Sequence, residues 1–185
     1  NTDMICITFQ PHGARMFFQL SMNELFNQSI SVDSLGLPEL KELDDRLMNT
    51  YDRRDCIFLI ESFLLNRFSQ SKEYNFRRMA TAIQAINQGE SDIDLLAQTS
   101  CLSLKQFRRV FAEYVGSNPK DFLRIIRFQR SLHIMQTFPQ DSLTDLTFKC
   151  GFYDQPHFIR EFKYFTGYTP SEYISICSPY SDYFV

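Results

Sequence analysis

The stretch from Gly151 to Tyr173 reads G-F-Y-D-Q-P-H-F-I-R-E-F-K-Y-F-T-G-Y-T-P-S-E-Y and decides the fold of the chain. Within it, Phe158, Phe162 and Phe165 recur at positions i, i+4 and i+7, which is the spacing of one apolar stripe along a helix. Asp154 precedes the stripe and can cap the amino-terminal turn of that helix. The pattern therefore predicts an amphipathic helix that packs through three phenylalanines.

The residues around this helix indicate a motif of two helices. Residues 143–150 read as a short helix, and Gly151 supplies the left-handed backbone that a sharp turn into the next helix requires. Arg160 and Lys163 fall on the outward face of the second helix, with His157 at its edge. A helix, a glycine turn and a helix with a basic outer face are the pattern of a helix-turn-helix motif that enters the major groove of DNA.

The same unit occurs a second time, 51 residues earlier in the chain. Residues 91–123 align without a gap over residues 142–174 with eight identities, whereas random pairing would give roughly two. We infer an internal repeat of two helix-turn-helix units, at about 91–115 and 142–166, in which the caps, the inner stripe and one outward arginine coincide. The identical pairs are Ser91/Ser142, Asp94/Asp145, Leu95/Leu146, Phe107/Phe158, Arg109/Arg160, Phe111/Phe162, Gly116/Gly167 and Pro119/Pro170.

The second unit ends in F-x-R-x-F-K-x-F-x-G-x-T-P, and two such units in tandem resemble the DNA-binding domain of the AraC/XylS family of bacterial transcription regulators. The resemblance covers about residues 76–177, and the first unit, with S-L-K-Q-F-R-R-V-F, fits it with less typical residues. It implies a cytoplasmic regulator, either an activator or a repressor, that binds double-stranded promoter DNA. A sensor or dimerisation domain usually precedes the DNA-binding half, and RNA polymerase and a second copy of the chain are further partners that such a regulator can have.

We therefore predict a mainly α-helical fold: two tandem helix-turn-helix units joined by a long linker helix, preceded by a helical linker and a remnant of a small β-containing domain. The predicted boundaries are 1–35 for the tail of the sensor domain, 36–74 for the helical linker and 75–178 for the AraC-type DNA-binding domain. A linker helix from Asn118 to Phe138 would span roughly 30 Å, close to the roughly 34 Å between successive major-groove faces on one side of DNA. Both units could then read adjacent major-groove segments. Residues 76–87 are predicted to form the first helix of the DNA-binding domain, Ser103 to Gln106 a capping box, Thr169 to Glu172 the cap of the closing helix, and the residues from Ser178 onward a short tail.

The first half of the chain is less distinctive. Alternating apolar residues at 5, 7 and 9 predict a half-buried strand, residues 14–20 a short helix, and Ser21 to Glu24 a capping box. Residues 38–48 and 52–68 predict two helices. The second has an apolar surface too wide for one stripe, which indicates either packing inside the protein or a dimer contact, and packing is favoured.

The residues expected to read bases lie on the outward, amino-terminal parts of the two recognition helices. Arginine and lysine can meet guanine O6 and N7, and glutamine can pair with adenine N6 and N7. The family's base-contacting positions align with six residues here: Lys105, Arg108, Arg109, Gln155, His157 and Arg160. Lys120 and Lys163, with the backbone amides after Asn118 and Thr169, are expected to contact phosphates.

Each of these cations has an alternative role. Arg108 and Arg109 could be ordinary solvated charges, and Arg160 could pair with Asp154 or Glu161 and serve only the fold. The arginines of the linker helix are expected to be solvated or to pair across it; they are Arg124, Arg127 and Arg130.

Two departures from the family pattern weaken parts of this interpretation. Pro156 replaces a residue that could form a hydrogen bond. Ser100 and Cys101 align with Gly151 and Phe152, so a distorted turn and weaker base readout are expected in the first unit.

Composition fits a folded protein but is unusual for a DNA-binding one. The formal net charge is −3 with a pI near 5.6, so binding would depend on a local basic face and not on the field of the whole molecule. The five cysteines are widely spaced and never form C-x-x-C, as expected of reduced, mostly packing residues. No apolar run approaches the roughly 18 residues that a membrane span needs, so a membrane is not an expected partner.

The sequence offers little support for catalysis. Its three histidines, His12, His133 and His157, are far apart in sequence, and none has a neighbour at metal-ligand spacing. No nucleophile elbow, phosphate-binding loop or dinucleotide fingerprint is present. We therefore expect no enzyme activity, no cofactor and no metal. The alternative function is a helical protein-interaction module that keeps this fold without binding DNA.

Overall fold

The computed structural model describes residues 4–70 and 74–176. Cys177 and the predicted carboxy-terminal tail lie outside the described residues, as do the first residues of the predicted sensor remnant. By its internal contacts the chain divides into two compact units, an amino-terminal unit Asn1–Pro119 and a carboxy-terminal unit Lys120–Val185. The first helix-turn-helix therefore groups with the segments that precede it. The predicted domain boundaries are a division by function and remain a prediction.

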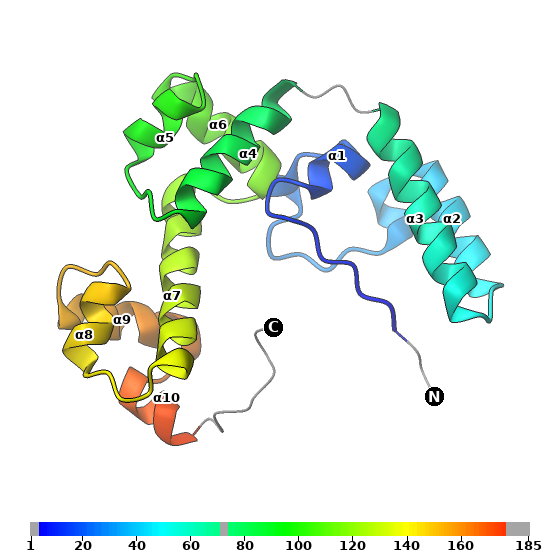
Figure 1. Cartoon of the computed structure of the whole chain (residues 1–185). Coiled ribbons are helices and arrows are strands. Elements are labelled where there is room, and N and C mark those ends of the chain that lie inside the picture. Colours follow the sequence, from blue (N-terminus) through cyan, green and yellow to red (C-terminus); the bar gives the residue numbers. More distant parts are fainter. Residues whose placement is uncertain (1–3, 71–73, 177–185) are drawn as a thin grey trace. The chain divides into compact units, whose positions relative to one another are not determined.

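The regular elements in the described part of the amino-terminal unit are all helices (Figure 1). Within the unit, α2 packs along α3, while α4, α5 and α6 pack on one another. The predicted helices at 38–48, 52–68 and 76–87 are confirmed to within two residues at each end. The elements are α1 (Ala14–Phe18), η1 (Met22–Glu24), η2 (Val32–Leu35), α2 (Pro38–Met48), α3 (Arg53–Gln70), α4 (Tyr74–Asn87), α5 (Ile93–Thr99) and α6 (Leu104–Val115).

The amino-terminal segment differs from its prediction in two details. Residues 4–10 carry no strand hydrogen bonding within the described part of the chain, because an extended segment becomes a strand only beside a second one. The capping box at Ser21 is wrong: its side chain accepts no bond from the η1 backbone, and its hydroxyl donates to Asn23 instead. η1 packs on α6, where the Met22 carbonyl oxygen lies 3.0 Å from the position of a Cβ on Gly116.

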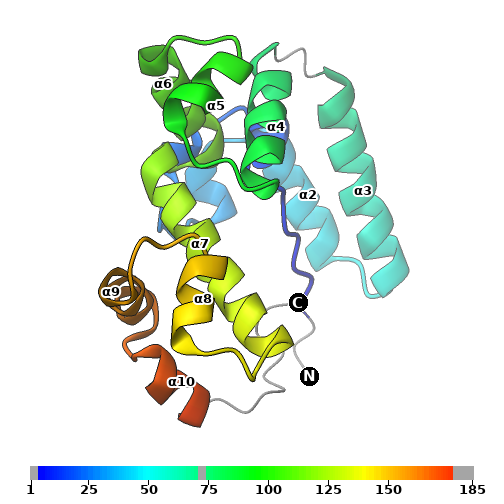
Figure 2. The same ribbon diagram turned by 60° about the vertical axis from the view of Figure 1, so that its left-hand side comes forward.

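The described helices of the carboxy-terminal unit are α7 (Pro119–Thr137), α8 (Leu143–Lys149), α9 (Gln155–Thr166) and α10 (Pro170–Ile176). Both views place α8, α9 and α10 around the second half of α7 (Figures 1 and 2). The long helix predicted to begin after Asn118 is confirmed, and so is the Thr169/Glu172 capping pair at the start of α10.

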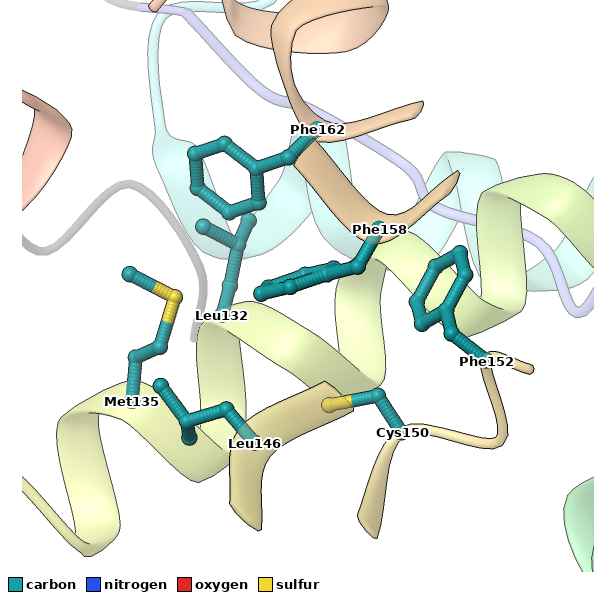
Figure 3. Packing of buried hydrophobic residues seen from close by; sticks show 7 residues of the cluster. All are labelled: Leu132, Met135, Leu146, Cys150, Phe152, Phe158 and Phe162. Atoms are coloured by element: carbon teal, nitrogen blue, oxygen red, sulfur yellow. The ribbon is translucent and has the colours of Figure 1, made fainter. Parts of the chain in front are cut away.

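A cluster of apolar side chains from α7, α8, α9 and the turn before α9 forms the core of this unit (Figure 3). Phe158 and Phe162 are 0% and 1% exposed, which confirms the predicted inner stripe. Phe165 is half-buried and stacks on Phe128, with ring centroids 4.7 Å apart. The cluster consists of Leu132, Met135, Leu146, Cys150, Phe152, Phe158 and Phe162.

The cysteines fit their prediction only in part. Burial raises the pKa of the Cys150 thiol to about 11, so this thiol stays protonated and acts as a packing group. Cys6 and Cys101 are exposed and Cys56 is half-buried, so packing does not explain them all. The four described cysteines are free thiols.

The two helix-turn-helix motifs are repeats, but their alignment contains a gap. The second helices, α6 and α9, match at the predicted offset of 51 residues: Phe107 and Phe111 are buried as Phe158 and Phe162 are. The first helices match at an offset of 50, because α5 is capped by Asp92 and α8 by Ser142.

Three of the predicted identities are therefore wrong as structural equivalents, including the proposed cap at Ser91. Leu95 is 43% exposed, whereas its supposed counterpart Leu146 is 3% exposed and matches buried Leu96. The pairs that fail are Ser91/Ser142, Asp94/Asp145 and Leu95/Leu146, since a gapless alignment cannot represent one extra residue in the second turn.

The corrected register also removes the expected distortion of the first turn. Cys101 adopts the left-handed backbone with φ 53°, as Gly151 does with φ 77°. The next residue closes each turn in the same way: the Leu102 N–H donates to the Ala97 oxygen, and the Phe152 N–H to the Thr147 oxygen, both at 3.0 Å. A non-glycine residue costs roughly 1–2 kcal/mol in this conformation, so the first turn keeps its shape at some expense in stability.

Candidate DNA-binding surface

The helix α9 presents a polar outer face from a well-fixed start. Asp154 caps it by accepting the backbone N–H of His157 at 2.7 Å, as predicted. Arg160 and Lys163 lie on the exposed face and form no ion pair with any described residue. Because both cations are turned to solvent and unpaired, this face can meet an anionic partner without first breaking a salt bridge.

Two other predicted readers of this helix have contacts inside the protein. The Gln155 side-chain amide donates to the Thr144 hydroxyl of α8 at 2.9 Å. His157 is half-buried, and its ring lies edge-on to Phe152 with centroids 5.4 Å apart. Gln155 would have to exchange this bond for one to adenine, so it is less free than Arg160.

An ion pair between α7 and α9 fixes how α9 is rotated. The Arg124 guanidinium donates twice to the Glu161 carboxylate, from Nε at 2.7 Å and Nη2 at 3.1 Å, and lies 4.7 Å from the centroid of the Tyr164 ring. The alternative in which Arg160 serves only the fold finds no support, because Glu161 pairs with Arg124 and Asp154 is engaged as the cap. Glu161 lies one position from Arg160, so this pair helps to hold the outer face outward.

The Arg124 pair gives the carboxy-terminal unit a measurable pH dependence. The hydrogen bond from Arg124, more than its charge, lowers the pKa of Glu161 below its usual value, although burial acts in the opposite direction. The pair therefore contributes stability above the unfolded-state pKa of Glu161, and this contribution is lost as the pH falls through the lower folded-state pKa. We expect Glu161→Gln to be less stable than the parent at pH 7, and the difference in free energy of unfolding to shrink towards pH 3.

Chemical denaturation of both proteins at several pH values would measure this difference. The comparison cancels the contributions of Asp145 and Glu172, whose pKa values are also lowered, by hydrogen bonds from Ser142 and Thr169 respectively. A difference that stays constant between pH 7 and pH 3 would contradict the assigned role of the Arg124–Glu161 pair.

The first recognition helix, α6, has the same design with more positive charge. Its capping box is confirmed: the Ser103 hydroxyl accepts the Gln106 N–H, and the Gln106 side chain accepts the Ser103 N–H. Lys105, Arg108 and Arg109 are all exposed and have no ion-pair partner in residues 4–70 and 74–176. All three predicted readers of α6 are thus available at its surface.

Lys120, one of the predicted phosphate contacts, is exposed in the first turn of α7. It is followed in the chain by the half-buried Asp121, whose negative charge partly neutralises the positive potential around Lys120. Of the arginines on α7, Arg124 forms the ion pair and Arg127 lies 5.6 Å from the Phe152 ring centroid, so both act within the unit.

One exposed residue of this surface was not predicted from the sequence. Tyr153 lies between Phe152 and the cap Asp154 and is 89% exposed. It is the extra residue of the second turn, where the first turn passes directly from Leu102 to its cap Ser103. A gapped alignment of the two repeats would have revealed it.

Comparison with known proteins supports what the geometry indicates. Residues 96–175 match the model of a helix-turn-helix domain family. An uncharacterised HTH-type transcriptional regulator of Haemophilus influenzae is 30% identical over 155 residues, which cover 81% of this chain and 50% of that protein. The HTH-type transcriptional activator RhaS of Escherichia fergusonii is 24% identical over 154 residues, covering 76% of this chain and 55% of RhaS.

These matches agree with the tandem motif. The chain contains a helix-turn-helix domain and resembles the AraC-type transcription regulators. An AraC-type regulator from Chromobacterium violaceum has a solved structure that is 23% identical and covers 52% of this chain and 88% of that one, with a TM-score of 0.48. The predicted resemblance and the mainly α-helical fold class are confirmed.

The chain spans about half the length of the relatives from Haemophilus and Escherichia described above. None of the described helices is long and apolar enough to cross a membrane. In the part of the chain that the structure describes, no group of three or more metal-ligating side chains is assembled.

Proposed function

We propose that this chain binds double-stranded promoter DNA in a sequence-specific way, with α6 and α9 as two recognition helices in adjacent major-groove segments. The observation that carries the proposal is the pair of outward helix faces. Each face belongs to an amphipathic helix that buried phenylalanines hold in the core. Each also carries exposed cations that have no ion-pair partner among the described residues. Arginine and lysine in such positions can donate to guanine O6 and N7.

The distribution of charge agrees with a local binding face. The acidic excess lies in residues 1–75, with 7 Lys and Arg against 11 Asp and Glu, whereas residues 76–178 hold 12 against 10. Because most affinity for DNA comes from cations near phosphates, Lys120 and Lys163 would add sequence-independent affinity beside the base readers. The base readers in this proposal are Lys105, Arg108, Arg109, Gln155, His157 and Arg160.

The wider role rests on the similarity to the relatives named above. They are transcriptional regulators, one of them an activator, so we propose that the chain acts in the bacterial cytoplasm at a promoter, either activating or repressing transcription. RNA polymerase and a second copy of the chain belong to this proposal as partners. The exposed Phe58 and Leu65 of α3, 67% and 69% accessible, offer a surface that a second copy could cover. No catalytic role is part of the proposal.

Selection of bound duplexes from a random pool, followed by gel shifts at several salt concentrations, tests the function directly. We expect enrichment of a defined sequence and an affinity that falls as salt rises, because bound cations displace condensed counterions. A helical interaction module that lacks DNA binding would enrich no sequence and shift no duplex at any salt concentration.

Arg160→Ala should weaken specific DNA binding by about 1–3 kcal/mol, the usual value of a good base contact. Its exposed side chain makes no ion pair with a described residue, so the melting temperature should not change. The charge-matched control is Arg54→Ala on the exposed surface of α3, which should leave both properties unchanged. Lys163→Ala should weaken binding to all sequences alike. Equal affinity of Arg160→Ala and the parent, with equal melting temperatures, would remove Arg160 from the readers.

A further inference from the structure

The second helix-turn-helix contains one residue more than the first, and that residue is an exposed tyrosine. Tyr153 is 89% accessible and directly precedes Asp154, the cap of α9. We propose that Tyr153 is a DNA-backbone contact, with its ring against a deoxyribose and its hydroxyl donating to a phosphate at the edge of the groove that α9 enters. This inference rests on the proposed DNA binding of α9.

The neighbours of Tyr153 hold its backbone in place. On one side Phe152 is 5% exposed, packs on Phe158 with ring centroids 5.1 Å apart, and bonds through its N–H to the Thr147 oxygen. On the other side the Asp154 carboxylate accepts the His157 N–H at 2.7 Å. Tyr153 is therefore fixed between two anchored residues, so a contact through its side chain would require little further ordering.

The Tyr153 side chain makes no contact on which the described part of the fold depends. No hydrogen bond or ring contact within the described ranges involves it, although several other tyrosines of the chain, such as Tyr114 and Tyr164, lie against an arginine. The first turn closes with the same hydrogen bonds without an equivalent residue, since Leu102 is followed directly by Ser103. The extra residue is thus not needed to make the turn.

Its position before the cap favours the DNA backbone over the base edges. When a recognition helix lies in the major groove, its amino-terminal residues face the base edges. A residue that precedes the cap therefore lies towards the wall of the groove, which is made of phosphates and sugars. Tyrosine suits this wall, because its ring covers apolar sugar atoms and its hydroxyl is a donor to phosphate oxygen.

A phosphate contact by a tyrosine differs from one by a lysine in its effect on the salt dependence of binding. A neutral side chain releases no condensed counterion, so losing it should lower affinity without changing the slope of log K against log salt. A backbone contact carries no sequence information, so the ratio of specific to non-specific affinity should also stay the same.

The test compares Tyr153→Phe and Tyr153→Ala with the parent on the selected duplex and on a scrambled one, over a salt series. Tyr153→Phe removes only the hydroxyl and should weaken binding to both duplexes by about 3- to 10-fold, the value of one hydrogen bond. Tyr153→Ala should weaken it further, with the salt slope and melting temperature unchanged. Tyr164→Phe removes a hydroxyl from α9 itself, on a ring packed against Arg124, and should leave affinity unchanged.

The outcomes separate this inference from the proposed function. If the parent binds with specificity and both Tyr153 variants bind equally well, the inference is overturned while the function stands. A loss confined to the selected duplex would overturn it in favour of a base contact. A parent that binds neither duplex would overturn the inference together with the proposed function.

Discussion

Replacing Phe162 with alanine is expected to lower the free energy of unfolding of the carboxy-terminal unit by about 3–5 kcal/mol. The side chain is 1% exposed and meets the rings of Phe128, Phe158 and Tyr173 at centroid distances of 5.4, 5.8 and 5.4 Å. Deleting it removes these contacts and leaves a cavity that three elements, held by their own hydrogen bonds, cannot close. Since a domain of this size has only about 5–15 kcal/mol in total, the loss is a large part of its stability.

Urea denaturation followed by helical circular dichroism would measure the change. Lys163→Ala is the matched control, because Lys163 is the next residue of α9 and is exposed; it should change stability by no more than about 0.5 kcal/mol. A Phe162→Ala protein as stable as the control would mean that the inner face of α9 is assigned wrongly.

The features predicted well from sequence are those that depend on residues close together in the chain. The capping residues Asp154 and Ser103 each accept a hydrogen bond from a backbone N–H only three residues further along the chain. The stripe of Phe158 and Phe162 follows from helical periodicity alone. The left-handed turn at Gly151 likewise needs no distant partner. These signals fixed where the recognition helices begin, and hence which side chains point outward.

The features that were not predicted from the sequence depend on residues far apart in the chain or on the difference in length between the two turns. Arg124 and Glu161 are 37 residues apart, and no local pattern indicates that they pair. The bond between Gln155 and Thr144 likewise joins two helices. Tyr153 was hidden because the gapless alignment set it against Leu102, a residue that ends the first turn.

The first turn illustrates a different limit. Its sequence lacks glycine, so distortion was the reasonable expectation, yet Cys101 accepts the left-handed conformation with φ 53°. The packing on either side, at Ser100 and Phe107, holds the turn in shape: both residues are no more than 1% exposed. Propensity alone cannot predict such a case, because the tertiary contacts outweigh a local cost of roughly 1–2 kcal/mol.

Inserting two base pairs between the two segments of the bound sequence is expected to reduce affinity almost to the non-specific level, a loss of about 10³-fold or more. The reason lies in α7, which is a single helix of 19 residues, about 28 Å long, and connects the first motif to the second along the chain. Two recognition helices on such a spacer should read segments about one helical turn, 10–10.5 base pairs, apart. Because α6 and α9 carry different readers, the bound sequence should not be a palindrome.

The insertion acts through rotation more than through distance. Two added base pairs turn one segment by about 70° around the duplex axis, which a stiff helix cannot follow. The control adds the same two base pairs outside the segments, where affinity should not change. Gel shifts at one salt concentration would measure both duplexes. If the insertion were tolerated, only one motif would read DNA, and Arg160→Ala and Arg109→Ala would then show which: the reading motif is the one whose variant loses specific affinity.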